Sequence, residues 1–208
     1  MISEDERSKA RRYRFDDNRE EYILGRGLLR QLIGGYLEQD PASVQFVYNP
    51  YGKPSLIGQG GPNRLTFNIS HAHGLVLCAF SRGRELGVDL ERIRPEAAQD
   101  GVAERFFSLA EVKSLRALPV HAQAIGFFNC WTRKEAYIKA RGEGLTIPLN
   151  QFDVSLVPGQ PAALLSSRIE PADTHRWSLQ ALNMGVQYVA ALAVEGPDWD
   201  LTCWDWQP

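Results

Sequence analysis

The sequence has few cysteines, and they are not spaced as in a metal site or a disulfide framework. The 208 residues include three, Cys78, Cys130 and Cys203, which lie far apart. There is no Cys-x-x-Cys pair and no Cys/His cluster with zinc-site spacing. Such usage is typical of a reducing compartment, so we expect a cytoplasmic protein.

The chain also lacks an excess of charge of either sign and any long apolar run. Its formal net charge is −2, which gives no general attraction to nucleic acid or to an anionic membrane, so neither is an expected partner. Residues 1–14 are charged and contain no apolar segment of the signal-peptide kind, and no stretch is long enough to span a bilayer. The glycines at 58–61 do not form a P-loop, because no GxxxxGK[ST] sequence is present.

What remains is a globular composition, with 44% hydrophobic and 23% charged residues, that reads as helices and short strands. Apolar periodicity predicts helices over 16–39 and from about 127 to a stop at Gly142. Ser108 and Glu111 form a capping-box signature for a further helix. The strand candidates are 44–48, 64–69, 75–80, 86–91, 145–149, 152–157, 177–182 and 187–194.

These elements predict an α+β fold made of two similar halves. We expect the strand pairs 75–80 with 86–91, and 177–182 with 187–194, to end the two halves. Residues 95–101 read as a linker, so the halves are predicted over 1–96 and 97–208. The Trp-rich segment 199–206 is expected to fill a surface groove.

The helix that begins near Phe127 carries a paired acid and base. Its apolar stripe contains Phe127, Trp131 and Ile138, and Glu135 and Lys139 lie four residues apart on the shoulder of that stripe. Such pairs are common on helix surfaces and contribute only about 0.2–0.5 kcal/mol. The pair alone therefore indicates a surface contact, and a functional reading needs a second acidic site.

The strand around Asp89 supplies that second site. Asp89 and Glu91 point to the same face, about 6.5–7 Å apart along the chain, so both can approach one divalent cation. With Glu135 they form an oxygen-only set of ligands, which favours Mg²⁺ or, as the alternative, Mn²⁺. Because Mg²⁺ is usually shared with phosphate oxygens, this set implies a phosphorylated substrate.

Several other polar residues can donate hydrogen bonds to phosphate. Lys53 lies between Gly and Pro in a turn, and Ser70 and His71 end a strand. Arg26 belongs to a row of arginines on the first long helix, which reads either as an anion site or as a solvated shoulder. Three separate segments therefore carry groups suited to a single phosphate-binding pocket.

Taken together and in this order, these motifs resemble the 4′-phosphopantetheinyl transferases, most closely the larger two-lobed type related to surfactin synthetase activators. The resemblance covers nearly the whole chain. It rests on the segments 52–54, 68–71, 87–91, 106–108, 131–139 and 145–149.

The resemblance implies two α+β halves in a pseudo-twofold arrangement with the active site in the cleft between them. Coenzyme A would be the donor, an apo acyl or peptidyl carrier protein the acceptor, and adenosine 3′,5′-bisphosphate the product that leaves. A monomer is expected, because two halves complete one site. Carrier helices are usually acidic, so Arg92, Arg94 and Arg133 are candidates for a basic docking patch.

The resemblance also implies residue roles. Asp89, Glu91 and Glu135 would hold Mg²⁺ at the pyrophosphate. Either Glu135 or a metal-bound water would accept the serine proton, and Lys139 would neutralise charge on the transferring phosphoryl group.

Coenzyme A would be bound by Arg26, Lys53, Ser70, His71 and Lys139.

Two features depart from the family pattern: the chain has little sequence before its first long helix, and Glu20-Glu21-Tyr22 stands where relatives often carry basic or hydroxyl residues. The alternative functions are a non-catalytic coenzyme A or carrier-binding module and a metal-dependent pyrophosphate hydrolase.

Overall fold

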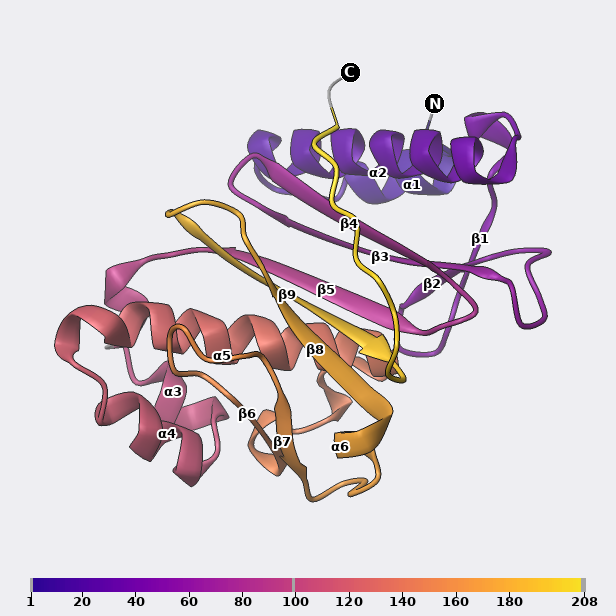
Figure 1. Ribbon diagram of the computed structural model, residues 1–208. Helices are drawn as coiled ribbons and strands as arrows, with labels where there is room; N and C mark the ends of the chain where they lie inside the picture. Colours follow the sequence, from indigo (N-terminus) through magenta and orange to yellow (C-terminus); the bar gives the residue numbers. More distant parts are fainter. Residues whose placement is uncertain (1, 99, 207–208) are drawn as a thin grey trace.

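The computed structural model describes residues 2–98 and 100–206 as an α+β protein, as predicted. The helices and strands, in chain order, are α1 Glu4–Ala10, α2 Asp16–Leu37, β1 Phe46–Tyr48, β2 Pro54–Leu56, β3 Leu65–Ala72, β4 Leu75–Arg82, β5 Leu86–Arg92, α3 Val102–Phe106, α4 Leu109–Arg116, α5 Val120–Arg141, β6 Phe152–Val154, β7 Leu164–Ser167, α6 Asp173–Arg176, β8 Trp177–Leu182 and β9 Tyr188–Glu195. Helix α2 covers β3 and β4, and α5 covers the sheet that contains β5, β9 and β8 (Figure 1).

The strand pairing differs from the sequence-based prediction in one respect. Strand β4 pairs with β3, and β5 pairs with β9 from the far end of the chain, so the expected β4–β5 pair is wrong. The pairing of β8 with β9 is as predicted. By its hydrogen bonds β5 therefore belongs to the sheet of the C-terminal half, although the predicted halves placed it in the N-terminal one.

A second correction concerns residues 145–149, which were expected to form a strand. The chain instead forms 3-10 turns at Gly144–Thr146 and Leu149–Gln151. Gly144 has φ +60, a left-handed conformation that interrupts an extended chain, and Pro148 has no N–H to give to a sheet.

The same series of elements occurs twice. Helices α2 and α5 each contain 22 residues and are capped by a residue in the left-handed conformation. A short hairpin and then a long hairpin follow each of them, after one 3-10 turn in the first half and two in the second, where α6 also precedes the long hairpin. A short helix precedes each of them, and Glu6 and Glu111 occupy the same place, three residues after the Ser that precedes their helices. Similar halves were predicted, although no residue-level repeat was visible in the sequence.

Each of these glutamates holds a buried cation of the long helix. Glu6 pairs with Arg30 at 2.7 Å, and Arg30 also donates to the carbonyls of Pro41 and Val44. Glu111 pairs with Lys134 at 2.8 Å, and Lys134 donates to two carbonyls of the corresponding later segment, those of Leu149 and Phe152. The two cores are therefore organised around equivalent ion pairs.

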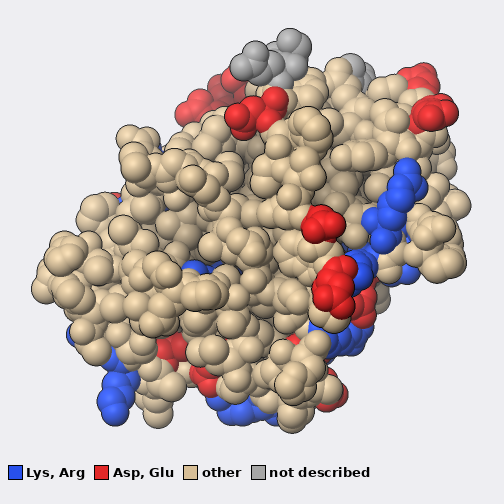
Figure 2. Space-filling model, in the orientation of Figure 1, with Lys and Arg blue, Asp and Glu red and all other residues tan. Residues whose placement is uncertain are grey.

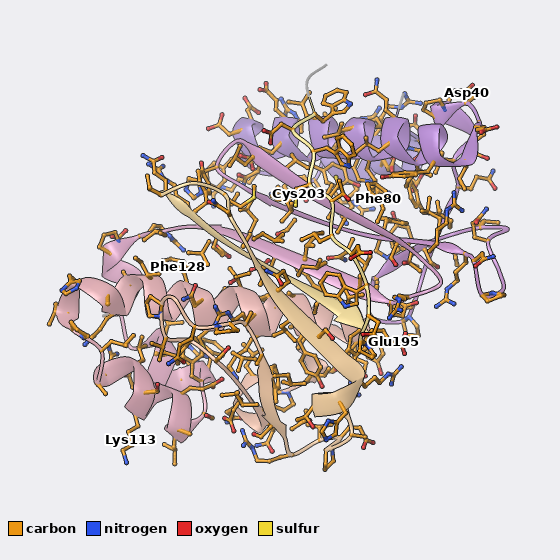
Figure 3. All side chains as sticks on the ribbon, viewed as in Figure 1. Asp40, Phe80, Lys113, Phe128, Glu195 and Cys203 are labelled. Atoms are coloured by element: carbon orange, nitrogen blue, oxygen red, sulfur yellow. The ribbon has the colours of Figure 1, made fainter. Side chains whose placement is uncertain are left out.

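The packing follows the two helices. Phe127 and Ile138 are buried on α5 and Trp131 is half-buried, so the predicted apolar stripe faces the core. Phe128 also points from α5 toward the strands, whereas Lys113 points away from the molecule (Figure 3). The segment after β9 crosses in front of the sheets toward α2 (Figure 1), and only its first tryptophan, Trp199, packs on a core cluster; Trp204 is 82% exposed.

Gly87 allows β5 to lie directly against α5. A Cβ at this position would be 2.3 Å from the carbonyl oxygen of Ala136 and 2.3 Å from the amide nitrogen of Ala140. Both atoms belong to the helix backbone, so a side chain cannot be accommodated by a rotamer change. The glycine fixes the spacing between β5 and α5, the two elements that carry the predicted acids.

We expect Gly87→Ala to destabilise the protein by about 1–3 kcal/mol or more, because the added methyl group must push β5 away from α5. Urea unfolding measures the loss. Gly27→Ala is the matched control: Gly27 lies within α2 with no atom in reach of a new Cβ, and alanine favours a helix. Equal stability of the two variants would contradict the proposed close approach.

Candidate functional site

Strands β3 and β5 lie side by side and are joined through side chains. The Oδ1 atom of Asn68 accepts a hydrogen bond from the Val88 amide at 2.9 Å, and the Oγ atom of Ser70 accepts one from the Leu90 amide at 3.2 Å. Two polar side chains thus satisfy backbone donors of β5 that would otherwise be buried without partners. This seam sets the position of Asp89, which lies between the two amides.

Asp89 and two predicted partners meet at the seam. Its Oδ1 atom accepts from the Lys139 ammonium at 2.6 Å and from the Ser70 hydroxyl at 3.1 Å, and Lys139 is also 3.3 Å from Ser70 Oγ. Asp89 is only 4% exposed. The structure therefore brings together residues from β3, β5 and α5 that are far apart in the sequence.

The second oxygen of Asp89 has no partner. Its Oδ2 atom is buried and accepts no hydrogen bond from any described residue. Burial raises the pKa of Asp89 against the opposing charge of Lys139. A buried, unpartnered carboxylate oxygen is costly, and a bound cation would compensate it.

Glu91 and Glu135 are near enough for their charges to act on Asp89 and on each other. Burial, together with the charges of Asp89 and Glu91, raises the pKa of Glu135 to about 7 against the opposing effect of Lys139. Burial and then the charge of Asp89 raise the pKa of Glu91 as well. Three carboxylates that repel one another around a single ammonium form a site with excess negative charge.

The donor set fits a hard divalent cation. All three side chains offer oxygen, and Asp89 has a lone oxygen available. In the part of the chain that the structure describes, however, no group of three or more acidic, His or Cys side chains is already arranged around a metal position. The carboxylates would therefore have to move toward a bound ion.

Lys53 lies outside this cluster, at the C-terminal end of α5. Its ammonium donates to the carbonyl of Ala140 at 2.8 Å and pairs with Glu85 at 2.8 Å. It lines a cavity of about 360 Å³ with Arg64 and Arg141, and Asp89 is not among the lining residues. In this structure Lys53 caps a helix, and it could meet a phosphate only by exchanging partners.

His71 lies on the exposed side of the seam, beside an acid that the predicted site did not include. Its Nδ1 atom is 3.6 Å from Glu21, whose carboxylate also accepts a hydrogen bond from the Gly74 amide. The departure from the family pattern at residues 20–22 was the signal for this residue. Glu21 thus contacts the His71 ring and the Gly74 amide, two groups that could otherwise donate to a phosphate near His71.

Arg26 is not part of the cluster. Its guanidinium is buried, pairs with Glu6 at 2.6 Å, donates to the Tyr48 hydroxyl and stacks over the Phe46 ring at 4.3 Å. Of the proposed docking arginines, Arg92 and Arg94 are exposed. Arg133 is 2% exposed, so its expected place in a surface patch is wrong.

The geometry defines a class of protein: a two-halved α+β enzyme scaffold with acids and a lysine gathered where the halves meet. Comparison with known proteins gives the family. The model of the 4′-phosphopantetheinyl transferase superfamily matches residues 85–193, and that of the 4′-phosphopantetheinyl transferase N-terminal region matches residues 1–82.

Two similar proteins are transferases of this family. The 4′-phosphopantetheinyl transferase HetI of Nostoc is 40% identical over 98% of this chain and 82% of its own length. The transferase Sfp of Bacillus subtilis is 34% identical over 75% of this chain and 67% of its own. Among solved structures, an apo-ACPS from Chronobacterium ammoiniagenes aligns with a TM-score of 0.41 and 19% identity, covering 55% of this chain and 98% of that one.

The chain therefore belongs to the 4′-phosphopantetheinyl transferase superfamily. Its predicted resemblance to the type that includes Sfp is confirmed. No helix among residues 2–98 and 100–206 combines the length and apolarity needed to cross a bilayer.

The raised pKa of Glu135 has a consequence for stability. Between its ordinary pKa of 4.5 and about 7 the folded chain holds a proton there that the unfolded chain has lost, so this group lowers stability as the pH rises through that window. We expect Glu135→Gln to raise Tm by a few degrees at about pH 8, with the gain vanishing near pH 4.

Thermal unfolding across this pH range measures the effect. Glu20→Gln, on the exposed surface of α2, is the control and should follow the parent protein at every pH. A parallel shift of the Glu135→Gln curve at all pH values would show that the charge of Glu135 is not the cause.

The burial of Arg26 predicts a structural cost for its removal. Arg26→Met should lower the free energy of unfolding by about 1.5–3 kcal/mol, because a charged hydrogen bond to buried Glu6 is lost. Arg19→Met, on the same helix but in a surface pair with Asp16, should change it by less than about 1 kcal/mol. Chemical denaturation compares the two, and losses of similar size would contradict the prediction.

Proposed function

We propose that this protein transfers the 4′-phosphopantetheine arm of coenzyme A to a serine of an apo acyl or peptidyl carrier protein, with Mg²⁺, or alternatively Mn²⁺, as cofactor. Adenosine 3′,5′-bisphosphate is the second product. Membership of the transferase superfamily supports the reaction class. The observation that carries the proposal is buried Asp89, paired with Lys139 at the seam and with one carboxylate oxygen left without a partner among the described residues.

Asp89, Glu91 and Glu135 would hold the cation. When bound, Mg²⁺ would neutralise charge on the pyrophosphate and orient it. The raised pKa values support this assignment: burial raises the pKa of all three carboxylates, the charge of Asp89 raises those of Glu91 and Glu135 further, and a dication would offset both effects.

Lys139 is the group best placed to meet the phosphoryl group. Its side chain is 29% exposed while its ammonium reaches Asp89 and Ser70, so it lies at the border between the buried acid and the solvent. Phosphoryl transfer depends mainly on positioning and on charge neutralisation. A lysine that exchanges part of its contact with Asp89 for a phosphate oxygen provides both.

The proposed general base is Glu135 or, as the alternative, a water held by the cation, and either would accept the proton of the carrier serine. Burial raises the pKa of Glu135 to about 7 in the metal-free chain, and a bound dication would lower it again. The serine oxygen then forms a bond to the phosphorus that bears the pantetheine arm. The bond from that phosphorus to the bridging oxygen breaks, and the electron pair leaves with the nucleotide bisphosphate.

The remaining contacts to coenzyme A are assigned to Ser70, His71, Lys53 and Arg26, which are supported to different degrees. Ser70 borders the acid cluster and His71 follows it on the exposed side. Lys53 lines the cavity next to the end of α5. Arg26 has the weakest support, because its guanidinium is already paired with Glu6.

The carrier protein is the proposed macromolecular partner. Arg92 and Arg94 follow Glu91 at the end of β5 and are exposed, which suits an acidic carrier helix. We infer a monomer in a reducing cytoplasm; the three cysteines are unpaired, in keeping with that compartment.

A mass-spectrometric assay with coenzyme A, Mg²⁺ and several apo carrier proteins tests the proposal. We expect one carrier to gain the mass of the phosphopantetheine arm, and Asp89→Asn to abolish the gain while keeping the fold, as checked by circular dichroism. Asp200→Asn, in the exposed C-terminal segment, is the control and should transfer normally. Coenzyme A binding without transfer to any carrier would instead indicate a binding module.

Steady-state kinetics assigns the role of Lys139. Lys139→Ala should lower kcat by about a hundredfold or more and change the affinity for coenzyme A much less, because the charge is needed most in the transition state. A loss confined to affinity would make Lys139 a phosphate-binding residue only.

A further inference from the structure

The C-terminal half contains a cavity of about 530 Å³ that is separate from the acid cluster. Its walls come from α5, from the loop between β6 and β7 and from β8. The lining residues are Ile125, Asn129, Arg133, residues 158–162, Leu179, Gln180 and Ala181. Arg133 is the single charged residue among them, and the others are apolar or carry neutral amides.

Arg133 is buried without a carboxylate. Its side chain is on a residue only 2% exposed, and its Nη1 atom donates to the carbonyl and the hydroxyl of Ser155 at 2.6 and 3.0 Å. Among the described residues no acid pairs with it, and Nε and Nη2 make no hydrogen bond. Burial lowers the pKa of this guanidinium, in keeping with the missing counter-charge.

The other buried cations each form an ion pair with a buried glutamate. Arg26 and Arg30 both pair with Glu6, and Lys134 pairs with Glu111. An isolated buried charge is costly, so each of these three is compensated within the fold. Arg133 is the exception within the described chain, and it borders open space.

The internal repeat shows that the architecture does not require a cation at this place. Helices α2 and α5 begin and end at equivalent residues, 16–37 and 120–141, so Arg133 corresponds to Leu29. Leu29 is 0% exposed and packs in the core of the first half. The same position can therefore be filled by an apolar residue, and the guanidinium of the second half needs another explanation.

The cavity wall beside Arg133 is held in place. The Ser155 hydroxyl donates to the carbonyl of Pro161 and accepts from the amide of Ala163, both at 2.8 Å, and Asn129 donates to the carbonyl of Leu156 at 3.1 Å. These bonds fix the β6–β7 loop against α5. On the face that carries β8 and β9 most side chains are uncharged, and a small basic spot is set back among them (Figure 2).

We propose that this cavity binds a small organic monocarboxylate, with its carboxylate on the free donors of Arg133 and its apolar body against the proline, leucine and alanine side chains of the wall. A guanidinium presents donors in the geometry of a carboxylate. One cation balances one negative charge, whereas phosphate sites usually gather several donors or cations. The size of the cavity, and a lining that combines apolar side chains with a few polar groups, are those of a small-molecule site.

Binding to the full-length chain is measured by isothermal titration calorimetry and thermal shift with butyrate, hexanoate and benzoate. Each acid is compared with its own primary amide, which has the same shape without the charge. We expect the acids to bind and to raise Tm, with affinity growing with the apolar body, and the amides to have no effect. Inorganic phosphate should bind more weakly than hexanoate.

Two variants test whether the acids bind in this cavity. Arg133→Lys should lose most of it, but this change also removes contacts that hold the loop. Ala181→Trp leaves Arg133 intact and fills the cavity from the exposed side of β8, so it should abolish binding of hexanoate. Val186→Trp adds the same side chain at a position that is 95% exposed and outside the cavity, and should bind as the parent does.

Four outcomes would overturn the proposal. They are an absence of binding by all three acids, equal binding of acids and amides, binding of phosphate as strong as that of hexanoate, and hexanoate binding that persists in folded Ala181→Trp.

Discussion

The site depends on the seam between β3 and β5, where side-chain hydrogen bonds replace the backbone hydrogen bonds of a paired sheet. Asn68 and Ser70 of β3 accept hydrogen bonds from the Val88 and Leu90 amides of β5, and so join the β3–β4 sheet to the edge strand of the β5–β9–β8 sheet. Because Ser70 also meets Asp89, the group that joins the two sheets is in direct contact with the acid. The join between the halves and the geometry of the site are therefore one arrangement, and a change in either alters the other.

Close packing completes this arrangement. Gly87 lets β5 approach the backbone of α5, which brings Lys139 to Asp89. Desolvation then raises the pKa values of the carboxylates that the cluster gathers. A buried group of like charges is unfavourable for stability, and such clusters are characteristic of sites where a protein binds or transforms a charged ligand.

Much of this could be read from the sequence, because the signals are local. The 3.6-residue periodicity located the later part of α5, which begins seven residues before the predicted start near 127, and the glycine located its end at residue 142. Strand alternation put Asp89 and Glu91 on one face. The sequence did not reveal which distant strands pair with one another. Pairing of β5 with β9 rather than with β4 leaves no local mark, since antiparallel neighbours can be distant in sequence.

The same limit applies to single residues. Arg26 was expected at the coenzyme A site because of the arginine row and the family resemblance, and Arg133 in a docking patch because carrier helices are usually acidic. Only tertiary structure shows that Arg26 is paired with Glu6 and that Arg133 is buried and lines a cavity. Lys53 was predicted to meet phosphate and is found at the end of a helix. The position of Glu21 beside His71 was signalled only by a departure from the family pattern.

The end of α5 shows how the halves depend on each other. The carbonyl of Ala140 accepts from Lys53, and the carbonyl of Gly142 accepts from the side chain of Asn49, so a turn of the first half supplies the terminal hydrogen bonds of the main helix of the second. Without the first half, that helix would lose both of these hydrogen-bond donors at its last turn. We therefore expect the two repeats, although alike in plan, to melt as a single cooperative unit, so that neither could be exchanged on its own.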